Sequence, residues 1–63
     1  MKVRDIVRRL EADGWRLVRQ KGSHRAVKHP EKPMVVTVPG HWNDDLPVGT
    51  LKSILGKAEL NES

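Results

Sequence analysis

Apolar residues near the start of the chain repeat at helical spacing. They are Val3, Ile6, Val7 and Leu10, which follow the i, i+3, i+4, i+7 pattern of one helix face. Gly14 stands where a helix favours a left-handed C-terminal cap, because glycine adopts that conformation without steric cost. The spacing therefore predicts an amphipathic helix that ends near Asp13.

A second stretch with helical spacing lies toward the end of the chain. Its apolar residues are Val48, Leu51, Ile54, Leu55 and Ala58. Proline suits a first helical position, and acidic residues complement the positive start of a helix; Pro47 and the preceding Asp44 and Asp45 meet these preferences. We therefore predict a helix from about Pro47 to Ala58, in which Gly56 costs up to about 1 kcal/mol relative to alanine.

Three segments between these helices have the pattern of strands. In "WRLVRQ", Trp15 and Leu17 alternate with Arg16, which predicts that Trp15 and Leu17 share a buried face. A turn at residues 21–23 leads into "HRAVKH". The segment "MVVTV" is the clearest strand, because it is rich in β-branched residues and is bounded by Pro33 and Pro39.

The order helix, strand, strand, strand, helix predicts an α+β fold in a single domain over residues 1–63. Two amphipathic helices need a shared apolar surface, so we expect both on one face of a three-stranded antiparallel sheet whose other face is open. If Val27 points toward the helices, His24 and Ala26 point to the open face, because side chains alternate along a strand. The opposite orientation of this strand would turn His24 inward.

Length and composition narrow the class of protein. A chain of 63 residues buries a small core and has marginal stability. It contains no cysteine, so disulfides and thiolate metal sites are excluded. The sequence shows no signal peptide and no apolar run near the roughly 18 residues that span a bilayer, which favours a cytoplasmic protein.

Charge is distributed unevenly along the chain. Residues 1–38 carry ten Lys and Arg against four Asp and Glu, whereas residues 39–63 carry two against four. A basic half is typical of proteins that bind a polyanion, and nucleic acid is the first candidate. A solvated cationic surface without a partner is the alternative that charge alone leaves open.

His24 is the candidate for chemistry on such a partner. RNA carries its own nucleophile, the 2′-hydroxyl, and an imidazole can exchange protons near neutral pH. One general acid or base contributes about 10²–10⁴-fold to a rate, so a single histidine could support slow cleavage. The spacing equally allows a structural histidine that begins a strand and bonds across the hairpin.

Several basic residues near His24 are candidate phosphate ligands. Lys21 and Arg25 flank it most closely, and Arg19 and Lys28 are one step further out. Cations at such positions would stabilise charge that develops on the phosphate. The turn before His24, including Ser23, could also offer backbone N–H groups to a phosphate.

A metal site and a base-stacking site find less support in the sequence. The spacing of His24, His29 and His41 relative to the acidic residues matches no compact metal-ligand pattern. Trp42 could stack on a base or fold over the sheet edge and cover the core. Covering is favoured, because so small a domain has few large side chains to close it.

Four motifs in order resemble the HicA (YcfA-like) toxin family. They are "VRDIVRRLEADGW", "GSHR", "VTVPGH" and "DLPVGTLKSILGKAEL", and together they cover almost the whole chain. The family consists of small bacterial mRNA interferases of toxin–antitoxin pairs. The resemblance implies a fold like that of double-stranded-RNA-binding domains and mRNA cleavage without a metal or other cofactor.

The resemblance also implies roles for particular residues and a protein partner. The histidine of Gly-Ser-His, here His24, is the expected catalytic residue. A HicB antitoxin would bind the toxin and mask this site, and its covering surface is expected to be acidic because it meets cations. His41 matches the family's second histidine and is expected to anchor its loop. The chain departs from the family's usual pattern at Arg25 and at Trp42. Arg25 is expected to add a cation beside the scissile phosphate.

A different class of function remains open beside this one. The same basic surface would suit a non-catalytic module that binds double-stranded RNA, which reads shape and phosphates and needs lysines rather than an imidazole. Substitution of His24 separates the two.

Overall fold

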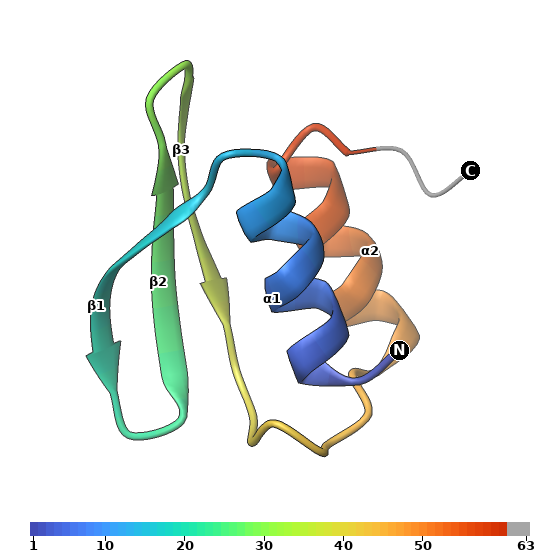
Figure 1. Cartoon of the computed structure of the whole chain (residues 1–63). Helices are drawn as coiled ribbons and strands as arrows, with labels where there is room; N and C mark the ends of the chain where they lie inside the picture. Colours follow the sequence, from blue (N-terminus) through green and yellow to red (C-terminus); the bar gives the residue numbers. More distant parts are fainter. Residues whose placement is uncertain (61–63) are drawn as a thin grey trace.

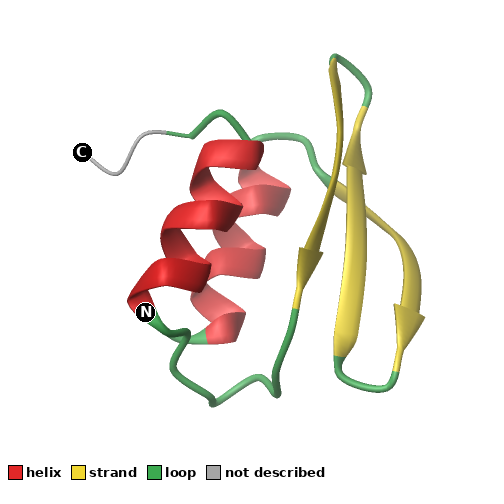
Figure 2. Cartoon of the chain, turned by 180° about the vertical axis from the view of Figure 1, so that it is seen from behind, coloured by secondary structure: helices red, strands yellow, loops and turns green. Residues whose placement is uncertain are grey.

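The computed structural model describes residues 1–60. Its elements, in order, are α1 (Val3–Ala12), β1 (Arg16–Lys21), β2 (His24–His29), β3 (Lys32–Val38) and α2 (Val48–Lys57). The two helices lie side by side on one side of the sheet, which is seen from the front in Figure 1 and from behind in Figure 2. The predicted element order and α+β arrangement are confirmed. No helix within the described residues is long and apolar enough to cross a membrane.

The sheet is antiparallel with the strand order β1-β2-β3. Lys21 pairs with His24 at the first hairpin, and Ala26 pairs with Thr37 on the other side of β2. The register between β1 and β2 shifts between Leu17 and Arg19, which marks a β-bulge. Both β1 and β3 are therefore edge strands, and β2 lies between them.

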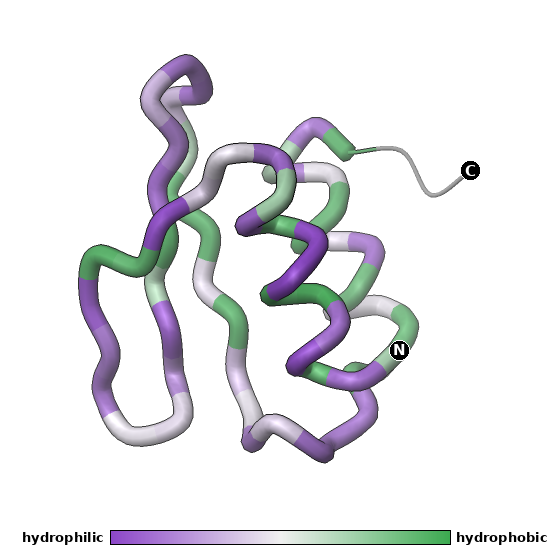
Figure 3. The backbone as a smooth tube through the Cα atoms, in the orientation of Figure 1, coloured by the Kyte–Doolittle hydropathy of each residue, from purple (hydrophilic) through white to green (hydrophobic). Residues whose placement is uncertain are grey.

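The core lies between the helices and the inner face of β2 and β3. Figure 3 shows apolar segments alternating with polar ones along both helices, as amphipathic helices require. The buried apolar residues are Val3, Ile6, Val7, Leu10, Trp15, Val27, Val36, Val38, Leu46, Leu51, Ile54, Leu55 and Ala58. All apolar positions used to predict the helices are in this set except Val48, which is exposed in the first turn of α2.

The end of α1 explains the Gly-Trp sequence. Gly14 has φ +108°, a conformation that favours glycine. A Cβ there would also lie 2.9 Å from His29 Nε2, so no larger residue fits. The chain then turns at once, and the Trp15 N–H donates to Leu10 O at 3.0 Å. This turn directs Trp15 into the core, where it is fully buried.

A polar cluster joins this turn to the far ends of the sheet and of α2. Lys32 Nζ donates to Asp13 Oδ2 at 2.6 Å and to Ala58 O at 2.8 Å. The hydrogen bond from Lys32 lowers the pKa of the Asp13 carboxyl. His29 Nε2 lies 2.7 Å from Asp13 O, and its Nδ1 accepts from the Glu31 N–H at 3.0 Å. Both nitrogens of His29 therefore hold the fold together.

The first residues of the chain are fastened to the loop before α2. Val3 N–H donates to Asp44 O at 2.9 Å, and Leu46 N–H donates to Met1 O at 3.0 Å. Pro47 caps α2 rather than occupying its first turn, and no side chain caps this end. The loop is thus held by α1, and the two helices are tied together at this end of the domain.

Two details of the strand predictions are wrong. Leu17 was predicted to be buried, but it is 55% exposed, and every residue of β1 is exposed. The reason is position, since β1 is the strand farthest from the helices in both views (Figures 1 and 2). Pro33 was predicted to bound the third strand but lies inside β3, which an edge strand tolerates because its outer N–H groups need no partner.

Candidate nucleic-acid interface

His24 begins β2 and is exposed on the face of the sheet away from the helices. It lines a hollow of about 290 Å³, here called the basic hollow, with Arg19, Lys21, Ala26 and Thr37. Val27, two residues from Arg25 on the same strand, is buried against the helices. Of the two orientations that alternation along this strand allows, the structure has Val27 inward and His24 on the open face.

The β-bulge in β1 brings Arg19 to this hollow. Leu17 pairs with Val27, so it lies on the inner face, and simple alternation would place Arg19 on that face too. The extra residue at the bulge instead pairs Arg19 with Ala26, on the same face as His24. Two cations, Arg19 and Lys21, thus line one hollow with the imidazole.

The hairpin turn between β1 and β2 is shaped by Gly22, whose φ is +59°. Gln20 Nε2 donates to Gly22 O at 3.1 Å and closes the turn. Ser23 is half-buried, and its carbonyl oxygen accepts a hydrogen bond from Arg25. The turn before His24 is therefore stabilised by hydrogen bonds from a side chain of β1 and a side chain of β2.

Arg25 does not lie beside His24. Alternation along β2 turns it to the opposite face, where it is only 6% exposed. Its Nη1 donates to Ser23 O at 3.2 Å and to Gly40 O at 2.8 Å. The expectation of an added cation at the scissile site is corrected by this placement: Arg25 ties the start of β2 to the loop after β3.

Trp42 covers the buried Arg25. Its ring stacks on the Arg25 guanidinium, with Arg25 Cζ 4.1 Å from the ring centroid, and Trp42 remains 49% exposed. This contact lies on the helix side of β2, so Trp42 is not placed to stack a base beside His24. Trp42 thus lies over a buried cation, and it also shares a hollow with Val7 of the apolar core.

Lys28 and His41 lie outside the basic hollow. Lys28 is on the same face of β2 as His24 but about 13 Å further along the strand, where it lines another hollow with Arg16. The His41 imidazole is exposed, and the bond that orders its loop is made by its backbone N–H, which donates to Asp44 Oδ2 at 3.0 Å. Among residues 1–60, the His41 side chain makes no hydrogen bond or ion pair that would anchor the loop.

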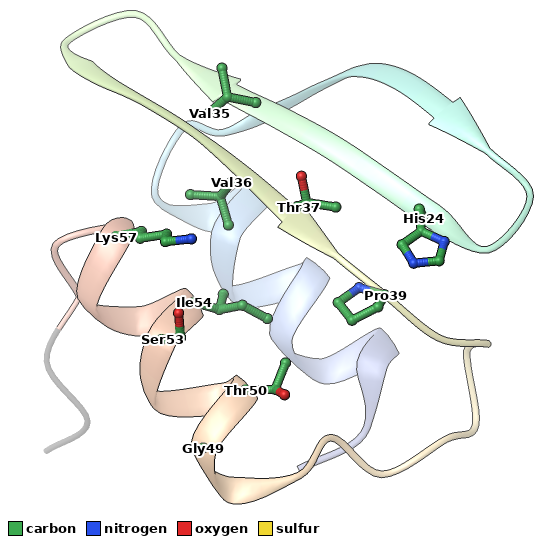
Figure 4. A pocket seen from close by; sticks show the side chains of 10 residues that line it. All are labelled: His24, Val35, Val36, Thr37, Pro39, Gly49, Thr50, Ser53, Ile54 and Lys57. Atoms are coloured by element: carbon green, nitrogen blue, oxygen red, sulfur yellow. The ribbon is translucent and has the colours of Figure 1, made fainter.

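A second hollow adjoins the first at His24. This β3–α2 groove, of about 460 Å³, runs between the outer edge of β3 and α2 (Figure 4). His24 lies at one end and Lys57 at the other, with Thr50 and Ser53 along the helix wall. His24 therefore stands on the ridge between two hollows. Sequence spacing could not reveal this groove, because α2 meets the sheet only in the folded chain.

Among residues 1–60, no three His, Asp or Glu side chains form a group that could hold a metal ion.

Comparison with known protein sequences shows the family of this chain. No curated protein matches the chain. A family model described as the HicA toxin of bacterial toxin–antitoxin systems matches residues 3–60, which include every element described above. The chain belongs to the HicA toxin family.

Proposed function

We propose that this toxin is an endoribonuclease that cleaves mRNA without a metal ion, with His24 as its general acid or base. The observation that carries the proposal is the exposed imidazole in a hollow shared with Arg19 and Lys21. Membership of a toxin family supports a damaging activity, and the basic surface supports RNA as its target.

The chemistry needs few groups because RNA supplies the nucleophile. The 2′-hydroxyl attacks the adjacent phosphorus, the 2′-oxygen loses its proton, and the 5′-oxygen leaves with a proton. His24 takes or gives one of these protons. Lys21 and Arg19 lie on the same face and stabilise the negative charge that grows on the phosphate oxygens. Lys28, further along β2, contacts a neighbouring phosphate, and the backbone of the Gly22-Ser23 turn is a further donor.

Products and metal dependence test this mechanism. RNA incubated with the purified toxin in EDTA is expected to be cut and to carry 2′,3′-cyclic phosphate or 3′-phosphate ends. Mass spectrometry of the fragments measures the ends. A reaction that stops in EDTA and resumes with a divalent ion would contradict it, as would 5′-phosphate ends.

Salt dependence tests the assigned cations. Each phosphate contact on single-stranded RNA contributes about −0.7 to the slope of log K against log salt concentration. The variants Arg19→Gln and Lys21→Gln are each expected to flatten the slope by about that amount. Arg8→Gln is the matched control, because Arg8 is exposed on α1 and does not line the basic hollow. Equal slopes for all variants would remove Arg19 and Lys21 from the site.

The alternative is a module that binds double-stranded RNA without cutting it. The same exposed cations favour it, because such recognition rests on phosphates and shape. Binding alone requires no proton transfer, so this alternative does not account for the position of the His24 imidazole in the basic hollow.

We also propose that a HicB-like antitoxin with an acidic surface covers the basic hollow. Opposite charge would compensate the buried cations and speed the encounter of the two proteins. Hydrogen exchange of the toxin alone and in the complex is expected to show new protection over residues 21–28. Protection confined to α2 would mean that the antitoxin acts without covering His24.

A further inference from the structure

The β3–α2 groove has the chemical character of a nucleotide site. Hydroxyl groups of Thr37, Thr50 and Ser53 line it beside apolar side chains, and no acidic residue is among its lining residues; the apolar ones are Val35, Val36, Pro39 and Ile54. Lys57 closes its far end with a cation. Polar hydrogen-bonding groups beside a single positive charge suit a sugar, a base edge and a phosphate better than they suit an apolar ligand.

Backbone groups add to this character. Within residues 1–60, β3 is an edge strand, so part of its N–H and C=O groups face the groove side without a partner strand. Pro39, just after β3, adds an apolar surface against which a ring can lie. Base edges in single-stranded RNA are recognised by such combinations of hydrogen bonds and flat contacts.

Continuity with the catalytic residue gives the groove its place in the reaction. His24 lines both the basic hollow and the β3–α2 groove. A strand whose scissile phosphate lies between His24 and the two cations of the basic hollow can therefore continue past His24 into the β3–α2 groove. From Thr50 to Lys57 the wall formed by α2 is about 10 Å long, which accommodates a nucleotide and the phosphate after it.

We propose that the β3–α2 groove is a subsite for the RNA nucleotide that adjoins the scissile phosphate on the side away from Arg19 and Lys21. Thr50 and Ser53 bind its sugar or base, and Lys57 binds the following phosphate. These contacts position the RNA over His24 and give the toxin a preference for the base at this position. The inference rests on the proposed ribonuclease function and adds the path of the substrate.

Two glycines of α2 provide a matched test. A Cβ at Gly49 or at Gly56 would meet nothing within 4 Å, so both accept a side chain without a clash. Gly49 lines the groove and Gly56 does not. The variants Gly49→Glu and Gly56→Glu have the same composition and net charge, but only the first places a carboxylate in the groove. Circular dichroism and thermal melting are expected to show that both variants remain folded, because neither added side chain meets a clash.

The readout is binding of a short single-stranded RNA with 2′-O-methyl groups, which cannot be cleaved. We expect Gly49→Glu to weaken binding about tenfold or more and Gly56→Glu to change it less than about twofold. Lys57→Gln is expected to flatten the salt slope by about 0.7, whereas Lys52→Gln, on the same helix but outside the groove, leaves it unchanged.

The outcomes separate this inference from the function on which it rests. If the wild-type toxin cuts RNA through His24 but both glutamate variants bind RNA equally well, the groove is not an RNA site and the proposed function stands. If Gly49→Glu disrupts only the complex with the antitoxin, the groove is a protein-docking site and the inference is overturned. A wild-type toxin that neither binds nor cuts RNA would overturn both.

Discussion

Replacing His24 with alanine is expected to lower RNA cleavage by about 10²–10⁴-fold, the usual contribution of a general acid or base. Toxicity to growing cells should be lost with it. The fold should be unaffected, because the imidazole is exposed and lies outside the apolar core. RNA affinity should also stay near the wild-type value, since Arg19 and Lys21 remain in the basic hollow.

His41→Ala is the matched control for this experiment. It removes a second exposed histidine that lines neither the basic hollow nor the β3–α2 groove. Initial rates on a labelled RNA and equilibrium binding of an uncleavable analogue measure the two properties separately. Cleavage by the His24→Ala toxin within a few fold of wild type would exclude the proposed role. Unchanged binding together with lost cleavage would also exclude the purely binding alternative.

Replacing Trp15 with alanine is expected to unfold most of the protein. A domain below about 70 residues rarely gains more than about 3–5 kcal/mol from its core. Large-to-small substitution of a buried tryptophan costs about the same, 3–5 kcal/mol. Trp15 is fully buried, packs edge-on against His29 with ring centroids 5.5 Å apart, and donates from Nε1 to Asp13 Oδ2. Urea denaturation followed by circular dichroism measures the loss.

Trp42→Ala is the control, because it removes the chain's other tryptophan from a half-exposed position. Its stacking on Arg25 is expected to contribute about 1 kcal/mol. Trp15→Phe, which keeps most of the ring volume, should retain a folded state that can be measured. A Trp15→Ala protein as stable as Trp42→Ala would show that the core does not depend on the residue after the α1 cap.

The main elements of this fold were predictable because local pattern and tertiary structure agree. Helical spacing predicts α1 from Val3, Ile6, Val7 and Leu10, and Gly14 marks its C-terminal end. The alternation along β2 placed His24 and Val27 on opposite faces, and both lie there. These predictions needed only periodicity and the preference of glycine for positive φ.

The rest of the site depended on relations between segments that periodicity does not contain. The β-bulge that brings Arg19 to His24 is a one-residue change in pairing between β1 and β2. The burial of Arg25 depends on Gly40 and Trp42, which reach it from a loop after β3. Leu17 has the pattern of a buried residue, but the helices do not extend over β1, and strand position cannot be read from one strand's own sequence.

The unpaired outer edge of β1 has a consequence for the behaviour of the toxin in solution. Leu17 and Val18 are both about half exposed on this edge strand, a combination that invites another strand to pair with it. Arg16, Arg19 and Lys21 lie on the same strand, and mutual repulsion of such charges keeps identical edges apart. Two of these cations, Arg19 and Lys21, are also the ones proposed to bind RNA, so we expect a toxin that lacks them to be less soluble as well as weaker in RNA binding.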